Sequence, residues 1–284
     1  MRYLTLALLA VAGSAHAHMA AIDDYSSGET WVAALLATAG LAYGAGVYRL
    51  WRSAAIGRGI SIAEALAFAV AWTTSIAALA EPAVALAGTS FAAHMTQHEA
   101  LMLLAAPLFV IGRPLAAWSW TFPEPWPQRI AGAAPVRVAA LVWRALTQPL
   151  VATLFQLAVV WVAHAPRVFD WALLHPWAHA GQHIGFFVAA IAFWTAMLRR
   201  SKSAEGLANA ALTFVTMLGI GALGALLTFS RMPWYAPYAL DDQRLGGLIM
   251  WIPGGLPYIA VALWLLMGSL RLWHSRKPRM AAEA

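Results

Sequence analysis

The chain has 284 residues, of which 62% are hydrophobic and 11% are charged. Soluble domains contain roughly 45–50% apolar residues, so this composition excludes an ordinary water-soluble domain. The formal net charge of +6 fits the excess of basic residues on the cytoplasmic side of membrane proteins, and no nucleic-acid partner is expected. The composition therefore predicts an all-α fold, a polytopic bundle of helices in lipid.

The first element is a predicted secretory signal peptide over residues 1–17. Arg2 precedes an apolar run from Leu4 to Ala12, and the small residues of Ala15-His16-Ala17 are typical of a cleavage site. We expect the mature chain to begin at His18 with a short extracytoplasmic segment, 18–30. If cleavage fails, residues 1–17 become a signal anchor, and the orientation of everything downstream is unchanged.

Apolar runs of spanning length predict about seven transmembrane helices after removal of the signal peptide. These expected helices cover residues 31–50, 62–80, 91–111, 143–163, 177–198, 207–229 and 247–270. The bundle thus occupies residues 31–270, and a basic cytoplasmic tail, 271–284, follows it. Glycine and alanine are frequent inside these runs, which allows helices to approach closely in lipid.

The longest connection, about 112–142, is rich in proline and contains Trp118, Trp120 and Trp126. Tryptophan rings prefer the headgroup region of a membrane. We therefore expect an extended or interfacial loop here, and a surface for a partner is the alternative.

The basic residues predict the orientation of the bundle, because Lys and Arg collect in cytoplasmic loops. The expected inner loops and tail contain Arg49, Arg52, Arg58, Arg113, Arg129, Arg137, Arg144, Arg199, Arg200, Lys202, Arg271, Arg276, Lys277 and Arg279. The expected outer loops contain Arg167, Arg231 and Arg244. This asymmetry predicts a multi-pass protein of a bacterial plasma membrane, with its mature N-terminus extracytoplasmic and its C-terminus cytoplasmic.

Most of the histidines fall at or just below the expected outer surface. They are His94, His98, His164, His175, His179 and His183. Residues four apart on a helix share one face about 6 Å apart along the axis, so the pairs His94/His98 and His179/His183 have the spacing of metal ligands. Facing helices of a bundle are where such sites are built. Hydrogen bonding across helices is the alternative for each pair.

The chain contains no cysteine, which excludes disulfides, thiolate ligands, iron–sulfur clusters and haem attached through CxxCH. Any metal must rely on histidine, methionine, carboxylates or backbone. Imidazole suits copper and zinc, and thioether sulfur favours Cu(I). Met95 and Met102 lie near the first pair, so copper is the preferred metal. Zinc remains open, and the two methionines would otherwise fill the core.

Several acidic residues lie near the histidines in the predicted topology. Glu99 lies inside an apolar run, where a carboxyl group is costly unless it is paired or hydrated, so it indicates a functional cavity. Asp170, Asp241 and Asp242 lie in expected outer loops. They could receive a cation, and solvated loop acids are the alternative reading.

Three blocks of the sequence resemble the caa3-type cytochrome c oxidase assembly factors called CtaG. The first runs from His94-Met95-Thr96-Gln97-His98 through Leu101-Met102 and Ala105-Ala106-Pro107-Leu108 to Gly112 and Pro114. The second contains His164-Ala165-Pro166, Phe169-Asp170, His175-Pro176-Trp177, His179 and His183. The third contains Asp242-Gln243, Leu245-Gly246-Gly247 and Met250-Trp251-Ile252-Pro253-Gly254-Gly255.

The resemblance implies a plasma-membrane protein needed for the maturation of a haem–copper oxidase, whose subunits would be its partners. We expect transient copper binding at the outer histidines and transfer to the oxidase. A haem-binding electron carrier and a copper transporter are the alternatives. Enzyme activity is not expected, because the chain has no GxSxG, HExxH or phosphate-binding loop. Metal stoichiometry, the oxidase subunit served and the oligomeric state are left open.

Overall fold

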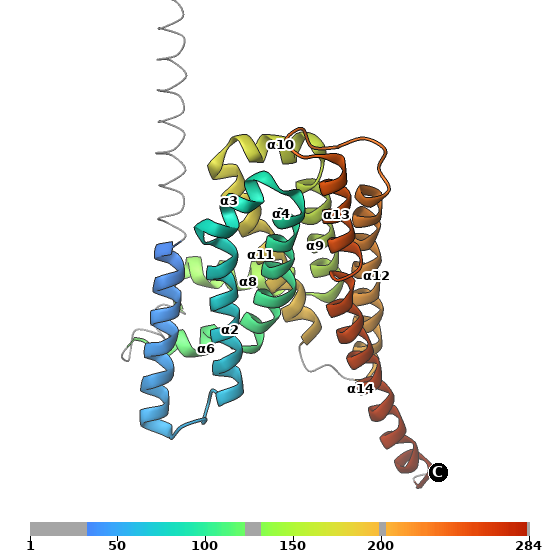
Figure 1. Ribbon diagram of the computed structural model, residues 1–284. Coiled ribbons are helices and arrows are strands. Elements are labelled where there is room, and N and C mark those ends of the chain that lie inside the picture. The colour runs from blue at the N-terminus through green and yellow to red at the C-terminus, as the bar shows by residue number, and fades with distance from the viewer. Residues whose placement is uncertain (1–32, 123–131, 199–202, 283–284) are drawn as a thin grey trace, which may run out of the picture.

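Figure 1 shows a computed structural model that describes residues 33–122, 132–198 and 203–282. The described residues form a helical bundle without a strand, which confirms the all-α fold. The expected signal peptide, 1–17, and the segment 18–30 lie outside the described residues, so both stay predictions.

The bundle contains long helices that run side by side and short helices that connect them (Figure 1). In chain order these are a helix over residues 33–54, α2 (Ile62–Leu79), α3 (Glu81–Thr89), α4 (Phe91–Glu99), the π-helical η1 (Ala100–Ala105), α5 (Ala106–Ile111), α6 (Pro114–Ser119), α8 (Ala134–Leu146), α9 (Pro149–Ala163), α10 (Pro166–Leu174), α11 (Pro176–Leu198), α12 (Ser203–Thr228), α13 (Leu240–Trp251) and α14 (Gly255–Ala282). Several begin at proline, whose missing N–H is no loss in the first turn.

Four helical stretches of the described residues are long and apolar enough to cross a membrane: Ile62–Leu79, Pro176–Leu198, Glu205–Thr228 and Leu240–Arg271. The pair α8 and α9 makes a fifth if it is counted as one broken span. The protein is therefore a helical membrane protein, and the count of seven spans stays a prediction. The expected helix 91–111 is a continuous helical path through α4, η1 and α5.

The connection expected over residues 112–142 as an extended or interfacial loop contains α6 and most of α8, so it is not extended in these parts; Trp126 lies outside the described residues. The expected helix 143–163 is wrong as one continuous helix, because the chain is bent by 87° between α8 and α9. The residue before a proline avoids the helical conformation, and Gln148 before Pro149 is extended. The bend turns α8 nearly perpendicular to α9, and none of the residues of α8 is buried.

Glycines allow the last helices to pack tightly beside α4. A Cβ atom on Gly224 of α12 would collide with the backbone of Gly247 in α13, and one on Gly247 would collide with that of Gly224. A Cβ on Gly246 would likewise meet Phe91 and Met95 of α4. Small residues at helix contacts are the usual means of close packing in lipid, and here they press α13 against the first histidine pair.

The end of the bundle at which α4 and α11 begin is covered by α10 (Figure 1). Phe169 of α10 is fully buried and packs on Phe91 and on Tyr235, with ring centroids 5.8 Å and 4.1 Å apart. This aromatic layer separates the interior, where the histidines lie, from that end of the molecule. Helix α10 lies between the expected helices 143–163 and 177–198, where no helix was predicted.

Candidate metal centre

The N-terminus of α4 is held by a residue from a distant part of the sequence. The side chain of Ser90 caps the helix by accepting a hydrogen bond from the Ala93 N–H at 3.2 Å. The Asp242 carboxylate of α13 accepts hydrogen bonds from the Ser90 hydroxyl at 2.9 Å and from the backbone N–H groups of Phe91 and Ala92. Carboxylates are favourable at a helix N-terminus, so Asp242 serves α4 and is not a free loop acid.

His94 and His98, the α4 pair, follow one and two turns later. Each is 1% exposed, and their Nε2 atoms lie 3.1 Å apart. The Tyr238 hydroxyl donates to the Ala87 carbonyl at 3.0 Å and lies 3.1 Å from His94 Nδ1. Because that hydroxyl has a single proton, it accepts from His94 Nδ1–H. The Nε2 lone pair of His94 therefore faces His98.

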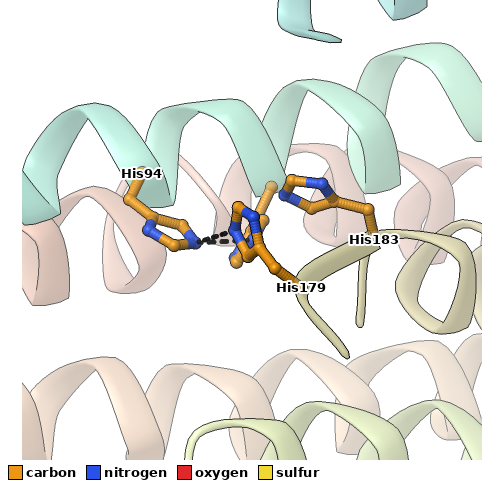
Figure 2. Close-up of side chains that lie close together, drawn as sticks. His94, His179 and His183 are labelled. Atoms are coloured by element: carbon orange, nitrogen blue, oxygen red, sulfur yellow. Dashed lines mark hydrogen bonds between the residues drawn. The ribbon is translucent and has the colours of Figure 1, made fainter. Parts of the chain in front are cut away.

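His179 and His183, the α11 pair, approach from the facing helix. Both are half-buried. His179 Nε2 lies 3.4 Å from His94 Nε2, and the ring centroids of His98 and His183 are 5.1 Å apart. Figure 2 shows His94, His179 and His183 turned toward one another. The two pairs together form the histidine cluster.

The histidine cluster offers one ligand nitrogen from each residue, and these nitrogens all lie within 4.8 Å of one another. A tetrahedral ion with metal–nitrogen bonds of about 2.0–2.1 Å separates two ligand nitrogens by about 3.3–3.4 Å, close to the observed 3.1 Å and 3.4 Å. Within the described part of the chain, His98 Nδ1 and His183 Nε2 are buried without a hydrogen-bond partner. Four imidazoles at this spacing fit a borderline or soft metal ion such as copper or zinc.

His164 and Met95 lie beside the histidine cluster. His164 is buried at the end of α9, and its ring centroid lies 6.1 Å from that of His98. Its Nδ1 lies 2.8 Å from the Val160 carbonyl, and its Nε2 lies 3.4 Å from Met95 Sδ.

The other two predicted ligands are placed differently. His175 Nδ1 bonds the Trp171 carbonyl at 2.8 Å, and its ring packs on Trp171 at 5.1 Å between centroids, outside the cluster. Met102 is buried in the hydrophobic core, where its backbone carbonyl accepts from Trp194 Nε1 at 2.8 Å. The structure therefore groups four of the predicted residues, places His164 and Met95 beside them, and separates both His175 and Met102 from the cluster.

Two tyrosines that were not predicted as site residues hold the histidines in place. Tyr238 fixes His94, and the Tyr235 hydroxyl donates to the His164 carbonyl at 2.9 Å. Burial raises the pKa of Tyr235, and the nearby Asp170 carboxylate adds to the effect, so this hydroxyl stays a proton donor. Both tyrosines lie in an irregular segment before α13, where no periodic pattern marks them. Asp242 was visible in the third resembling block, but its role in capping α4 was not.

The α11 pair also borders a cavity of about 410 Å³ between the helix 33–54, α2 and α11. Its walls are mostly apolar, including Leu36, Trp72 and Ile184, and His179 and His183 lie on one side. The α4 pair does not line it. The cavity therefore leads to the cluster from the α11 side.

Glu99, which the sequence analysis linked to a functional cavity, is buried one residue after His98. A Cβ on Gly254, at the break between α13 and α14, would meet its carboxyl group. Among the described residues its Oε2 has no hydrogen-bond partner, and the same holds for Gln156 Oε1 and Thr153 Oγ1 on α9.

Comparison with known proteins gives one family match. A family model described as cytochrome c oxidase caa3 assembly factor (Caa3_CtaG) matches residues 41–271. No curated protein and no solved structure matches the chain. The matched range contains the whole histidine cluster, together with Tyr238 and Asp242.

Proposed function

Since the chain belongs to the cytochrome c oxidase caa3 assembly factors, we propose that it matures a haem–copper oxidase by binding copper and passing it to an oxidase subunit. The ligands in this proposal are His94, His98, His179 and His183. Copper is the cargo, and the protein itself catalyses no reaction. The distribution of Lys and Arg supports a plasma-membrane location with the histidine cluster near the extracytoplasmic surface.

The observation that carries this proposal is the convergence of two HxxxH pairs from different helices on one point. The four ligand atoms lie within 4.8 Å of one another, although the pairs are separated by 85 residues in the chain. Uncharged imidazoles can bind Cu(I) or Cu(II). The hydrogen bond from His94 to the Tyr238 hydroxyl orients the ring of this ligand, which supports a built site over an accidental cluster.

The same geometry disfavours the haem alternative. Two axial ligands approach haem iron from opposite sides, so metal–nitrogen bonds of about 2.0 Å would place their nitrogens about 4 Å apart. His94 and His98 are on one helix with their Nε2 atoms 3.1 Å apart. These rings leave no space for a porphyrin between them.

The proposal is tested with full-length protein purified in detergent. We expect bound copper in the wild type and its loss in both H94A/H98A and H179A/H183A. His175→Ala is the matched control, because His175 is an outer histidine outside the cluster, and it should keep wild-type copper. Unchanged copper in either double variant would reject those ligands. In cells lacking the native protein, the double variants should also fail to restore oxidase activity, while His175→Ala should restore it.

Copper transport is the second candidate, and the buried polar atoms of Glu99, Gln156 and Thr153 favour it. The Gln156 amide donates to the Tyr258 hydroxyl at 3.0 Å, so polar groups continue from the cluster into the apolar interior. Polar residues inside a membrane bundle often mark ion paths. Copper uptake into vesicles containing the pure protein, abolished in Glu99→Gln, would replace the transfer proposal with transport. If vesicles with the wild-type protein take up no copper, transport is rejected, and transfer of copper to an oxidase subunit at the outer surface stands.

A further inference from the structure

Beside the histidine cluster, two buried atoms with lone pairs face each other. His164 Nε2 and Met95 Sδ lie 3.4 Å apart, and the side chains belong to α4 and to the end of α9. Met95 is fully buried, and His164 is 1% exposed. Because the residues are 69 positions apart in the chain, this contact is created by the packing of the helices.

The hydrogen bonds of His164 determine where its proton is. The Val160 carbonyl, 2.8 Å from Nδ1, can only accept, so the proton of the neutral ring is on Nδ1. Nε2 therefore presents a lone pair to Met95 Sδ, and a thioether has no proton to donate. Nothing on either side chain supplies a hydrogen bond between these two atoms.

We propose that His164 and Met95 form a second metal site, separate from the histidine cluster and selective for a soft monovalent ion such as Cu(I). Bonds of about 2.0 Å to nitrogen and about 2.3 Å to sulfur at a tetrahedral angle place the two ligand atoms about 3.5 Å apart. The observed distance is 3.4 Å. An imidazole with a thioether is a softer pair of neutral ligands than two imidazoles, and the chain has no cysteine.

Both ligands of this soft site are held in place by their neighbours. A Cβ on Gly246 of α13 would press on Met95, which shows how closely the backbone of α13 approaches this side chain. The carbonyl of His164 accepts from the Tyr235 hydroxyl at 2.9 Å. A methionine that only fills space would not require an imidazole lone pair directed at its sulfur. Two ligands of one metal ion do require their lone pairs to point to the same place, as His164 Nε2 and Met95 Sδ do.

His98 connects the soft site with the histidine cluster. Its Nε2 faces His94 at 3.1 Å, while its ring centroid is 6.1 Å from that of His164. Its Nδ1 is buried and has no partner among the described residues. The inference rests on the proposed function, because it makes the soft site a second holding position for the same copper. The ion then moves between positions through His98 without leaving the interior.

The test compares Cu(I) and Zn(II) binding by the full-length protein under anaerobic conditions. Zn(II) reports on the histidine cluster, and the soft site should add one Cu(I) beyond it. Met95→Leu preserves side-chain volume and removes the sulfur, and His164→Asn retains a donor for the Val160 carbonyl and removes Nε2. We expect each to bind one Cu(I) fewer than the wild type and the same Zn(II). Met102→Leu is the matched control, since Met102 is a buried methionine on the same helical path.

X-ray absorption at the copper edge gives the second readout. A sulfur neighbour of copper should be present in the wild type and Met102→Leu and absent in Met95→Leu. Unchanged Cu(I) stoichiometry and sulfur signal in Met95→Leu would overturn the soft site. Loss of Zn(II) binding in Met95→Leu would also overturn the soft site, because it would show that Met95 acts only by holding the histidine cluster in shape. Failure of the proposed function would give a different result from failure of the soft site. In that case H179A/H183A would bind as much Zn(II) and copper as the wild type.

Discussion

The two histidine pairs have the same HxxxH spacing but very different surroundings. On α4, His94 and His98 are each 1% exposed, and the Tyr238 hydroxyl and the Asp242 cap fix the ring of His94 and the start of the helix. On α11, His179 and His183 are half-buried and border a cavity of about 410 Å³. Identical local patterns thus produce one enclosed pair and one accessible pair.

This difference indicates a division of roles within one metal centre. Ligands that are held in place before binding cost less free energy to order, so the α4 pair should supply most of the affinity. The α11 pair, which borders the cavity, should be the side from which copper enters and leaves. The two pairs can therefore be separated experimentally by affinity and by rate.

The largest effect is expected from His94→Ala, which removes the most fixed ligand. Copper affinity should fall by more than the roughly 10–100-fold that is typical when a residue hydrogen-bonded to a metal ligand is lost. His179→Ala removes a ligand from the accessible pair and should reduce affinity less. Competition titration of purified variants measures both values. Equal losses, or a larger loss in His179→Ala, would contradict the division of roles.

Tyr238→Phe tests whether the α4 pair depends on its hydrogen bond. The substitution keeps the ring and removes the hydroxyl that orients His94, so copper affinity should fall by about 10–100-fold. Tyr258→Phe is the matched control. It removes another buried hydroxyl, bonded to Gln156 at 3.0 Å, and should leave copper affinity unchanged. If both variants lower copper affinity equally, the cause is a general loss of packing and not the orientation of His94.

Asp242→Asn tests whether the cap on α4 positions the pair. Loss of the charge-assisted hydrogen bonds should destabilise the protein by about 1–2 kcal/mol and lower copper affinity by about tenfold, since 1.4 kcal/mol corresponds to a factor of ten. The neighbouring Asp241 is 93% exposed in its side chain and pairs with Arg244. Asp241→Asn should change neither thermal unfolding in detergent nor copper affinity, and an equal effect of both substitutions would argue against the cap.

Much of this architecture could be predicted from local patterns. Apolar runs predicted α2, α11 and α12 closely, because spanning length is a strong signal. Helical spacing predicted that His94 faces the same way as His98. The bend at Pro149 also had a local signal in the proline, which the length of the apolar run obscured.

The rest depends on contacts between distant segments. The sequence does not reveal that α4 and α11 are neighbours, which decides whether His179 meets His94 or only lipid. Asp242 caps a helix 150 residues earlier in the chain, and no periodic pattern marks such a bond. His175 has the same four-residue spacing from His179 as His179 has from His183, yet it precedes Pro176 at the start of α11 and turns to Trp171.

The smallest expected effect concerns the path to the α11 pair. Ala180 lies between His179 and His183 in the sequence and lines the same cavity. Ala180→Leu should therefore narrow the cavity through which copper passes while leaving every ligand in place. Copper release to a chelator should slow by roughly threefold to tenfold, because the ion must wait for the side chain to move aside, while equilibrium affinity stays the same. Gly181→Leu is the matched control, since a side chain there meets open space. Unchanged release rates in Ala180→Leu would mean that copper does not pass through the cavity, and the accessible pair would lose its assigned role.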